Sequence, residues 1–383
     1  MRAALLPLFL VWAPLARAQP SEDRLNALEQ RLSSLENARS NNATSAFNPA
    51  LGAALDIAAV QTDSKATINL RAAELTLQAP IDPYLKGWIV ATGSPDTVSL
   101  EEAAVRTTAL PHSLSLTAGR LFASFGRLAR FHDHELPVIE RPRSLDTFVG
   151  GETQADGVEL SYLFPTPFYL SAQAGMFNKI GADNARADNA VERPLDNFTY
   201  LGRLTAYADF GDDHSLELGA SQAWTPKRIV PDAAGTETTR KNTWRTLAGI
   251  DLTYRYQPVA GGLYKGAIWS AEIMQNNERR FDAATLLPRD RVRSYAGVSY
   301  LQLKLGRRFS PGVMIDLSED LDAPKTLTRT YTGFLSFHMS EYQRLRVSAS
   351  RIDDAAAPGR RGNRLGLQWT AVLGVHTHSF KDR

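Results

Sequence analysis

The residues best suited to chemistry in this sequence are four consecutive polar side chains, His132, Asp133, His134 and Glu135. Imidazole nitrogens and carboxylate oxygens are ligands that zinc accepts, and side chains two residues apart on an extended segment point the same way. A histidine pair alone lacks the third protein ligand that a zinc site needs. We therefore name His132 and His134 as candidate metal ligands. Two other interpretations stay open, a pH-sensitive gating loop and plain solvated polar residues.

The sequence offers little that could carry catalysis. Cysteine is absent, which excludes a thiolate nucleophile and a thiolate metal site. His214 and His338 stand alone in separate segments, and no Gly-x-Ser-x-Gly nucleophile motif is present. The acidic pair Glu101 and Glu102 is interpreted as a solvated cap near a turn. We predict that the protein is not an enzyme and needs no cofactor.

The histidine cluster lies in the longest connection of the chain, Ala123–Ala155. A long loop inside a wide barrel can fold inward and narrow the pore, and its charges then set ion preference. The alternative is a loop that stays outside as surface cover. We predict a constriction loop, and the charged residues in or beside it besides the cluster are Arg120, Arg127, Arg130, Glu140, Arg141, Arg143 and Asp146.

The elements that would position this loop follow from a rhythm that runs from about Phe47 to Phe380. Segments of roughly ten residues alternate apolar and polar side chains, and their connections are alternately short and long. In Asn363–Val375, for example, Leu365 and Leu367 share one face while Arg364 and Gln368 share the other. Period-two alternation keeps one face in hydrocarbon and the other in water. The pattern predicts an all-β fold, a transmembrane antiparallel β-barrel with its long loops outside.

About sixteen such segments can be counted, and the even number returns the last strand to the side where the first began. A barrel of this size is expected to leave an aqueous lumen rather than a packed core. The segments begin near Ala50, Ala66, Tyr84, Val98, Ser113, Gly157, Phe168, Asn197, Ser215, Trp244, Gly266, Arg291, Gly312, Arg329, Arg344 and Asn363.

The first 46 residues divide into two further parts. Residues 1–18 have a basic residue, a short apolar run and a small-x-small site ending at Ala18, as a secretory signal peptide does. Residues 19–46 form a helix and a polar spacer before the barrel at 47–383. The helix carries an a/d leucine seam that predicts a short periplasmic coiled coil; an amphipathic helix on the barrel mouth is the alternative. The seam residues are Leu25, Leu28, Leu32 and Leu35.

Several local motifs resemble a family of Gram-negative outer-membrane porin-like barrels, similar in layout to the phosphate-selective porin superfamily. The resemblance implies that a short coiled coil leads into a Phe-Asn-Pro-Ala motif and then a barrel, and that the protein lies in the outer membrane. Some members are labelled zinc-regulated outer-membrane receptors, but we find no separate plug domain here. The chain departs from the usual aromatic ending of such barrels. The motifs are Phe47–Ala50, Leu114–Gly126, His132–His134, Glu140–Pro142 and Phe148–Gly151, and Lys381–Arg383 follow Phe380 at the end.

These observations predict a passive channel for small hydrophilic solutes, a homo-oligomer with a trimer favoured. Its partners are outer-membrane lipid and solutes; the near balance of 43 basic and 41 acidic residues gives no support for nucleic acid. The alternatives are a zinc-uptake receptor or channel that uses the histidine loop, and a closed structural or adhesion barrel. Inward-facing arginines predict a weak anion preference. They are Arg203, Arg245, Arg255, Arg344, Arg346 and Arg364, against Asp209, Glu217, Asp251 and Glu272.

Overall fold

The computed structural model describes residues 49–187, 192–231, 237–239, 243–262, 264–281, 288–355 and 361–374. The predicted signal peptide and the leucine seam of the coiled coil, Leu25, Leu28, Leu32 and Leu35, lie outside these residues. No helix among the described residues is both long and apolar enough to cross a membrane.

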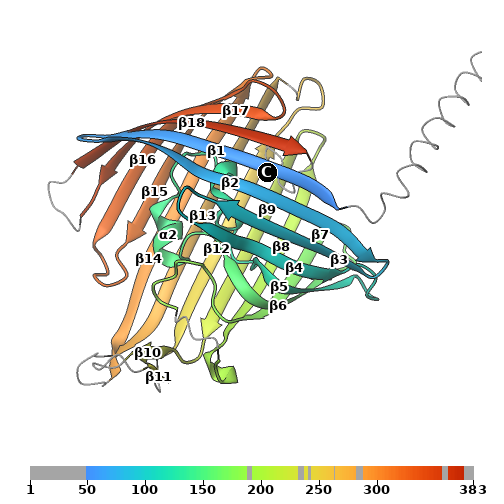
Figure 1. Cartoon of the computed structure of the whole chain (residues 1–383), viewed down its shortest axis with the longest axis vertical. Helices are drawn as coiled ribbons and strands as arrows, with labels where there is room; N and C mark the ends of the chain where they lie inside the picture. The colour runs from blue at the N-terminus through green and yellow to red at the C-terminus, as the bar shows by residue number, and fades with distance from the viewer. Residues whose placement is uncertain are drawn as a thin grey trace, which may run out of the picture. The chain divides into compact units, whose positions relative to one another are not determined.

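Sixteen antiparallel strands close into one barrel, in which β1 pairs with both β2 and β18 (Figure 1). The hairpin of β10 (Ile229–Pro231) and β11 (Glu237–Thr239) lies in the connection between β9 and β12. The barrel strands are β1 (Ala50–Thr62), β2 (Ala66–Asp82), β3 (Leu85–Gly93), β4 (Val98–Thr107), β5 (Leu114–Phe122), β6 (Gln154–Leu163), β7 (Tyr169–Phe177), β8 (Thr199–Phe210), β9 (His214–Thr225), β12 (Arg245–Tyr256), β13 (Lys265–Phe281), β14 (Pro288–Leu305), β15 (Phe309–Glu319), β16 (Leu327–His338), β17 (Gln343–Asp353) and β18 (Arg361–Gly374).

The barrel and its strand number confirm the prediction from sequence periodicity. Each of the sixteen predicted starting points lies within three residues of an observed one. The faces are also as predicted: on β18, Leu365 and Leu373 are 57% and 67% exposed, whereas Gln368 and Thr370 are fully buried. A closed barrel leaves no unpaired edge, so its apolar outer face can lie in lipid while polar side chains line the inside.

The two ends of the barrel differ in their connections. At the short-turn end, where β1 begins and β18 ends, strands are joined by connections such as Gly211–Asp213 between β8 and β9. The long-loop end carries the connection 123–153 between β5 and β6, which we call the inner loop. The inner loop contains the short helices η2 (Leu128–Arg130), η3 (Asp133–Glu135) and α2 (Arg143–Phe148), and another, η4 (Leu195–Asn197), precedes β8.

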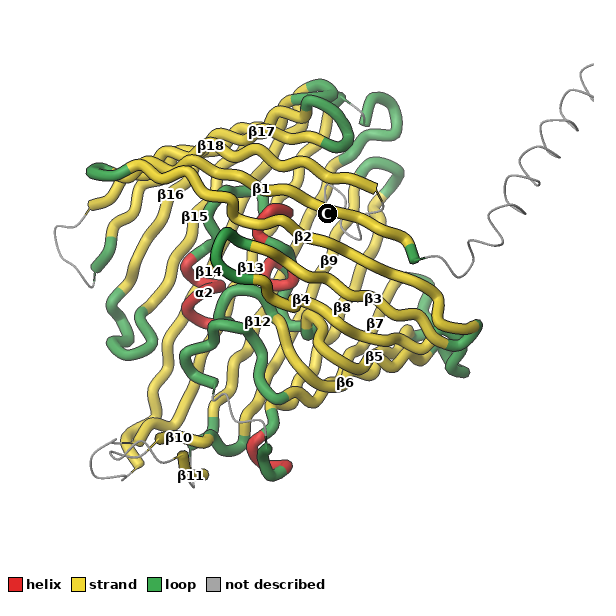
Figure 2. The backbone as a smooth tube through the Cα atoms, viewed as in Figure 1, coloured by secondary structure: helices red, strands yellow, loops and turns green. Residues whose placement is uncertain are grey.

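The inner loop folds into the barrel, as the sequence predicted, and its helices lie among the strands (Figure 2). One expectation was wrong, however, because the lumen is not purely aqueous. Phe125, Leu128, Leu145 and Phe148 of the loop are at most 1% exposed and form one apolar cluster with wall residues such as Met274. The inner loop therefore builds a packed core inside a barrel that is wide enough to be a pore.

Candidate functional site

The inner loop is fastened to the wall first where it leaves β5. Gly126 adopts a positive φ of 60°, and a Cβ there would lie 2.0 Å from a carboxylate oxygen of Glu272. Only glycine tolerates both conditions without strain. Glu272 is buried in β13 and accepts the backbone N–H groups of Arg127 and Leu128 at 3.2 and 3.0 Å. The Arg127 guanidinium then reaches Ser270 and Tyr300 on the same wall.

Arginines on the opposite side of the barrel hold the loop by its carbonyl groups. Arg344 of β17 donates to the carbonyl of His134, and Arg346 donates to that of Val138 at 3.0 Å. Arg71 of β2 donates to the carbonyl of Ile139 and pairs with Asp133 at 3.0 Å. A carbonyl satisfies the hydrogen bonds of a guanidinium but does not neutralise its charge. Positive charge is therefore concentrated where the loop crosses the lumen.

The remaining arginines predicted to face the lumen have different surroundings. Arg203 forms a buried two-bond pair with Asp251 at 2.6 and 2.9 Å, and Arg255 contacts Glu217 at 3.4 Å. Arg245 is buried and donates to three neutral oxygens, among them the carbonyl of Phe148 in the loop.

Three further arginines had been assigned to the constriction loop. Arg120 lies in β5 rather than in the loop, and pairs with Asp156 at 2.7 Å. Glu159 is buried and faces inward on β6, and side chains alternate along a strand, so Asp156 faces outward. Arg120, its partner, therefore belongs to the outer face, and placing Arg120 in the constriction was wrong. Arg130 ends η2 and is half-buried, and Arg141 joins Asp133 to Glu152 at 2.7 and 3.1 Å.

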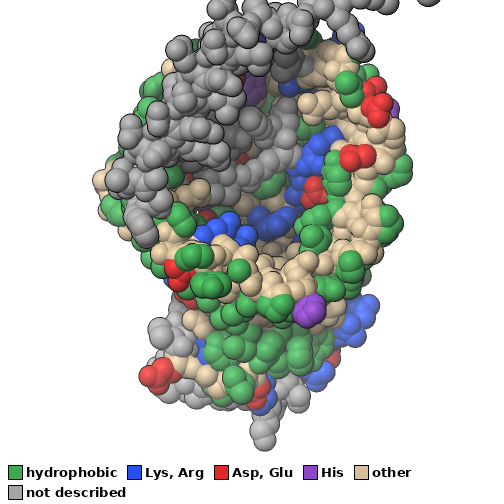
Figure 3. Space-filling model, turned by 90° about the vertical axis from the view of Figure 1, so that its right-hand side faces the viewer, with side chains coloured by type: hydrophobic (Ala, Val, Ile, Leu, Met, Phe, Trp, Pro, Cys, Tyr) green, Lys and Arg blue, Asp and Glu red, His purple; other side chains and the backbone are tan. Residues whose placement is uncertain are grey.

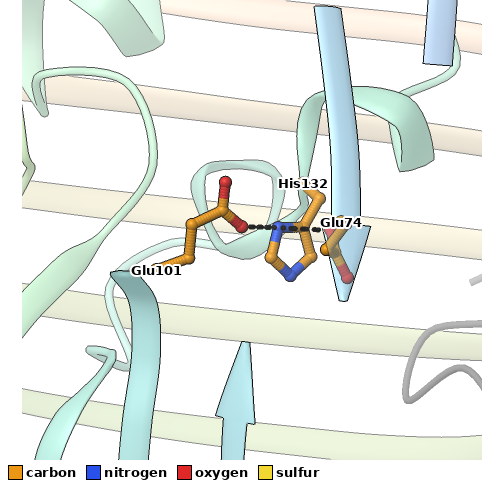
Figure 4. Close-up of side chains that lie close together, drawn as sticks. All are labelled: Glu74, Glu101 and His132. Carbon is orange, nitrogen blue, oxygen red and sulfur yellow. Dashed lines mark ion pairs between the residues drawn. The ribbon is translucent and has the colours of Figure 1, made fainter. Parts of the chain in front are cut away.

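The histidine cluster lies in a nest of carboxylates from β2, β4 and the end of the loop. His132 Nδ1 is 2.9 Å from a Glu101 oxygen, 3.6 Å from Glu74 and 3.9 Å from Glu152 (Figure 4). His134 Nδ1 is 3.8 Å from the same Glu74 oxygen, and the two imidazole rings stack with their centroids 5.5 Å apart. Both histidines are at most 3% exposed. The structure thus brings His132 and His134 together with three carboxylates that the sequence analysis had not assigned to the site.

The nest controls the protonation of its members. Burial alone lowers the pKa of His132, but the hydrogen bond to Glu101 and the charges of Glu152 and Glu74 outweigh burial, so the pKa is well above its ordinary value. Burial raises the pKa of Glu152 to about 7, although His132 and Arg141 oppose the change. In the absence of a metal ion, His132 is therefore a cation at neutral pH and the nest holds it by charge.

Glu101 reaches the nest because of a β-bulge. The register of β3 and β4 pairs Ala91 with Leu100 and Val90 with Glu102, which leaves Glu101 as the extra residue. A bulge re-aims a side chain that strict alternation would place on the other face. Interpreting Glu101 and Glu102 as a solvated cap was wrong, since their side chains are largely buried against the inner loop. The available signal was the pair of adjacent carboxylates itself, since strict alternation in a strand would turn one of the two toward lipid.

A vestibule of about 810 Å³ opens between the inner loop and the long-loop ends of β15–β18. Its lining holds seven acidic residues and four arginines: Glu101, Asp133, Glu140, Asp146, Glu152, Asp183 and Asp316, with Arg71, Arg141, Arg143 and Arg364. Burial beside other acids raises the pKa of Asp146 to about 6, against the opposing charge of Arg141. The vestibule is therefore acid-rich.

The short-turn end has the opposite character. Seen from that side, the molecule is hollowed and Lys and Arg side chains line the visible interior (Figure 3). A small cavity there is lined by Arg255, Lys265 and Lys304 and by no acidic residue among those described.

Known proteins share this architecture. No protein-family model matches the chain, and an uncharacterised protein of Aquifex aeolicus is 28% identical over 84% of this chain and 71% of its own length. Among solved structures, an anion-selective porin from Comamonas acidovorans covers 85% of this chain and 99% of its own with a TM-score of 0.59 and 12% identity. The trimer form of OmpT, an outer-membrane protein of Vibrio cholerae, covers 85% and 99% with a TM-score of 0.55 and 11% identity.

A third solved structure, the outer-membrane channel DcaP of Acinetobacter baumannii, covers 85% of this chain and 97% of its own, with a TM-score of 0.54 and 11% identity. At such identities the likeness is one of fold. The chain has the 16-strand fold of outer-membrane porins, which confirms the architecture expected from its sequence.

Proposed function

We propose that the protein is a porin-like channel for passive diffusion of small hydrophilic solutes. The observation that carries the proposal is the inner loop, which folds into a closed polar-lined barrel and leaves a vestibule of about 810 Å³ at the long-loop end. A space of that volume suits a small solute. The fold shared with channels and porins supports the same conclusion. The proposal involves no catalytic step and no cofactor.

The solute path runs along the polar side of the inner loop. The other side of the loop is closed by its apolar contacts with the wall, including Phe125 and Phe148. On the polar side, the vestibule is lined by Ser348 and Ser350 of β17, and Arg346 is the next inward residue toward the short-turn end. Arg346 hydrogen bonds to Val138 of the loop, so this contact forms the floor of the vestibule.

We propose a weak anion preference for the same channel. Arg245 and Arg346 donate hydrogen bonds only to neutral groups in the described residues, so no direct ion pair offsets their charge at the loop. The acid-rich vestibule opposes this effect. However, a fixed charge acts most strongly where the passage is narrow and poorly hydrated, which favours the arginines.

Planar-bilayer recording of the purified protein tests the channel. We expect stable stepwise openings of small conductance, since the inner loop fills much of the lumen, and a reversal potential slightly on the anion side in a salt gradient. A silent barrel would refute the channel and favour the closed structural or adhesion barrel.

A second function, divalent-cation binding for zinc uptake, is favoured by one specific observation. His132 Nδ1 and one oxygen each of Glu74 and Glu101 lie within 4.8 Å of one another. Ligands about 2.0–2.1 Å from a tetrahedral zinc ion stand roughly 3.3 Å apart, which is close to the observed 2.9 and 3.6 Å. His134, 3.8 Å from Glu74, could supply a fourth ligand. Zinc would have to displace the proton of His132.

We also propose that the chain is exported by a signal peptide at residues 1–18 and assembles as a homo-oligomer, with a trimer favoured. The leucine seam at 25–35 would register the subunits. Replacing Leu28 and Leu32 with Asp should then weaken the cross-linked oligomer while the barrel still folds, because the barrel closes its hydrogen bonds within one chain. An unchanged oligomer would rule out a role for the seam.

A further inference from the structure

A second, smaller cavity lies at the long-loop end, beneath the connection between β7 and β8. Its volume is about 30 Å³, enough for a water molecule or a small ion. Inward-facing residues of β8, β9 and β12 form its wall, including Thr199, Ala223 and Leu247. It therefore opens toward the lumen and not toward lipid. We call it the arginine pocket, because four arginines line it: Arg186, Arg193, Arg228 and Arg245.

The charges around the arginine pocket are not balanced within the described residues. No carboxylate is among its described lining residues. Arg186 and Arg228 share the single carboxylate of Glu278, at 3.5 and 3.1 Å, with Arg280, also at 3.1 Å. Asp322 is a second acid for Arg186 and Arg280, at 2.5 and 3.6 Å.

Arg245 is a fourth arginine beside Arg186, Arg228 and Arg280, which share these two acids. It is 6% exposed, and among the described residues it donates only to neutral oxygens, of Asn276, Asn184 and Phe148. Arg228 is 8% exposed, and burial lowers its pKa even though Glu278 opposes the change. Buried guanidinium groups in excess of carboxylates are costly unless a further anion reaches them.

The chemistry of the lining identifies the class of ligand. Guanidinium groups present planar pairs of N–H donors that match the oxygens of a carboxylate or another oxyanion. The hydroxyl groups of Thr199 and Thr225, which lie 2.8 Å apart on the wall, can add donors. The small volume excludes a bulky ligand but admits an ion or the acidic group of a larger solute.

We propose that the arginine pocket is a binding site for a small oxyanion, either a free inorganic anion or the carboxylate of a solute that enters at the long-loop end. That the ligand is a solute in transit rests on the proposed channel function, whereas the binding itself does not. The site lies apart from the His132 nest, and it gives the inner wall a positive subsite beside the acid-rich vestibule.

Calorimetric titration of the folded, full-length protein in a non-ionic detergent tests the site, with sodium sulfate as the first probe and sodium acetate as the second. We expect saturable sulfate binding by the unmodified protein. Arg228→Gln should weaken it at least about tenfold, since it removes one positive charge from the lining of the pocket. Ala223→Leu should weaken it as much by filling the pocket while every arginine stays in place.

Arg255→Gln is the matched control, because Arg255 is another inward arginine of β12 that lies outside the pocket and pairs with Glu217. Its sulfate binding should equal that of the unmodified protein. Absence of saturable binding to either probe would overturn the proposal, and so would sulfate binding that Ala223→Leu leaves intact. Acetate binding without sulfate binding would assign the pocket to a carboxylate. Bilayer recording on the same samples keeps a failure of the channel distinct from a failure of the site.

Discussion

The two sides of the inner loop are built from different interactions. One side buries Phe125, Leu128 and Phe148 against β12–β14 and neighbouring strands, with no polar group of these side chains to satisfy. The other side, formed by the polar side chains and the carbonyl groups between His132 and Arg141, is held by ion pairs and by arginines that donate to those carbonyls. The apolar side can only be packed or lost, whereas the ionic side can exchange its partners for water, ions or solute.

This difference separates anchoring from function along a single segment. Burial of the phenylalanine side chains holds the loop against the wall, and each contributes about 1.5–3 kcal/mol to the stability of the fold. Ionic contacts contribute less net stability, because desolvation offsets much of their attraction. They nevertheless decide which charges face the path. We therefore expect substitutions on the apolar side to change how far the pore is open, and those on the ionic side to change what binds or passes.

The largest effect should come from Phe148→Asp. A carboxylate in this fully buried apolar site loses its hydration and costs several kcal/mol, about 4 or more, so the loop should leave the wall. We expect single-channel conductance to rise severalfold and the melting temperature to fall. Thr147→Asp, which adds the same charge at a half-buried neighbour in α2, is the control. Unchanged conductance in Phe148→Asp would show that the apolar side does not close the lumen.

Sequence periodicity could predict the barrel because the alternation of apolar and polar residues within each strand shows which side chains face lipid and which face the lumen. The same information could not predict the contacts of the loop. Arg344 is 210 residues from His134, and barrel closure alone decides that the two meet. Arg71 is the extra residue of a bulge in β2, where Leu70 pairs with Ile57 and Ala72 with Asp56. Local alternation misplaces a residue at a bulge, and Glu101 lies at a bulge of the same kind.

The next effect concerns the carboxylate nest and separates a metal site from a charge-held histidine. If zinc binds there, Glu101→Gln and the double change His132→Ala with His134→Ala should each lower its affinity at least about tenfold, because each removes a ligand. Glu102→Gln is the matched control, since Glu102 is the adjacent buried carboxylate of β4 outside the ligand set. Calorimetry that detects no zinc binding to the unmodified protein would leave the nest as a structural contact only.

A smaller effect is expected for Arg346→Gln, which removes one charge where the loop crosses the lumen. One charge about 10 Å from a passing ion in a water-like medium changes its energy by about 0.4 kcal/mol, with opposite sign for an anion and a cation. The ratio of anion to cation permeability should therefore fall about fourfold. Reversal potentials in a salt gradient measure this ratio. Arg351→Gln serves as the control, because Arg351 lies on the outer face of the same strand. A shift of equal size in both variants would contradict a role for Arg346 at the constriction.

The smallest effect should be a pH dependence of the vestibule. The pKa of Asp146 is raised to about 6, so this carboxyl is mostly charged at pH 7 and mostly neutral at pH 5. Lowering the pH through 6 removes one negative charge from the acid-rich lining and should shift selectivity slightly toward anions. Asp146→Asn keeps this position neutral at every pH, so its selectivity at pH 7 should already be shifted toward anions. The change that remains between pH 5 and 7 should be smaller than in the unmodified protein and should come from Glu152, whose pKa is about 7. If the selectivity of that variant changes with pH as much as that of the unmodified protein does, another group carries the pH dependence. The ionic side of the loop would then act on the passing ion through that group and not through Asp146.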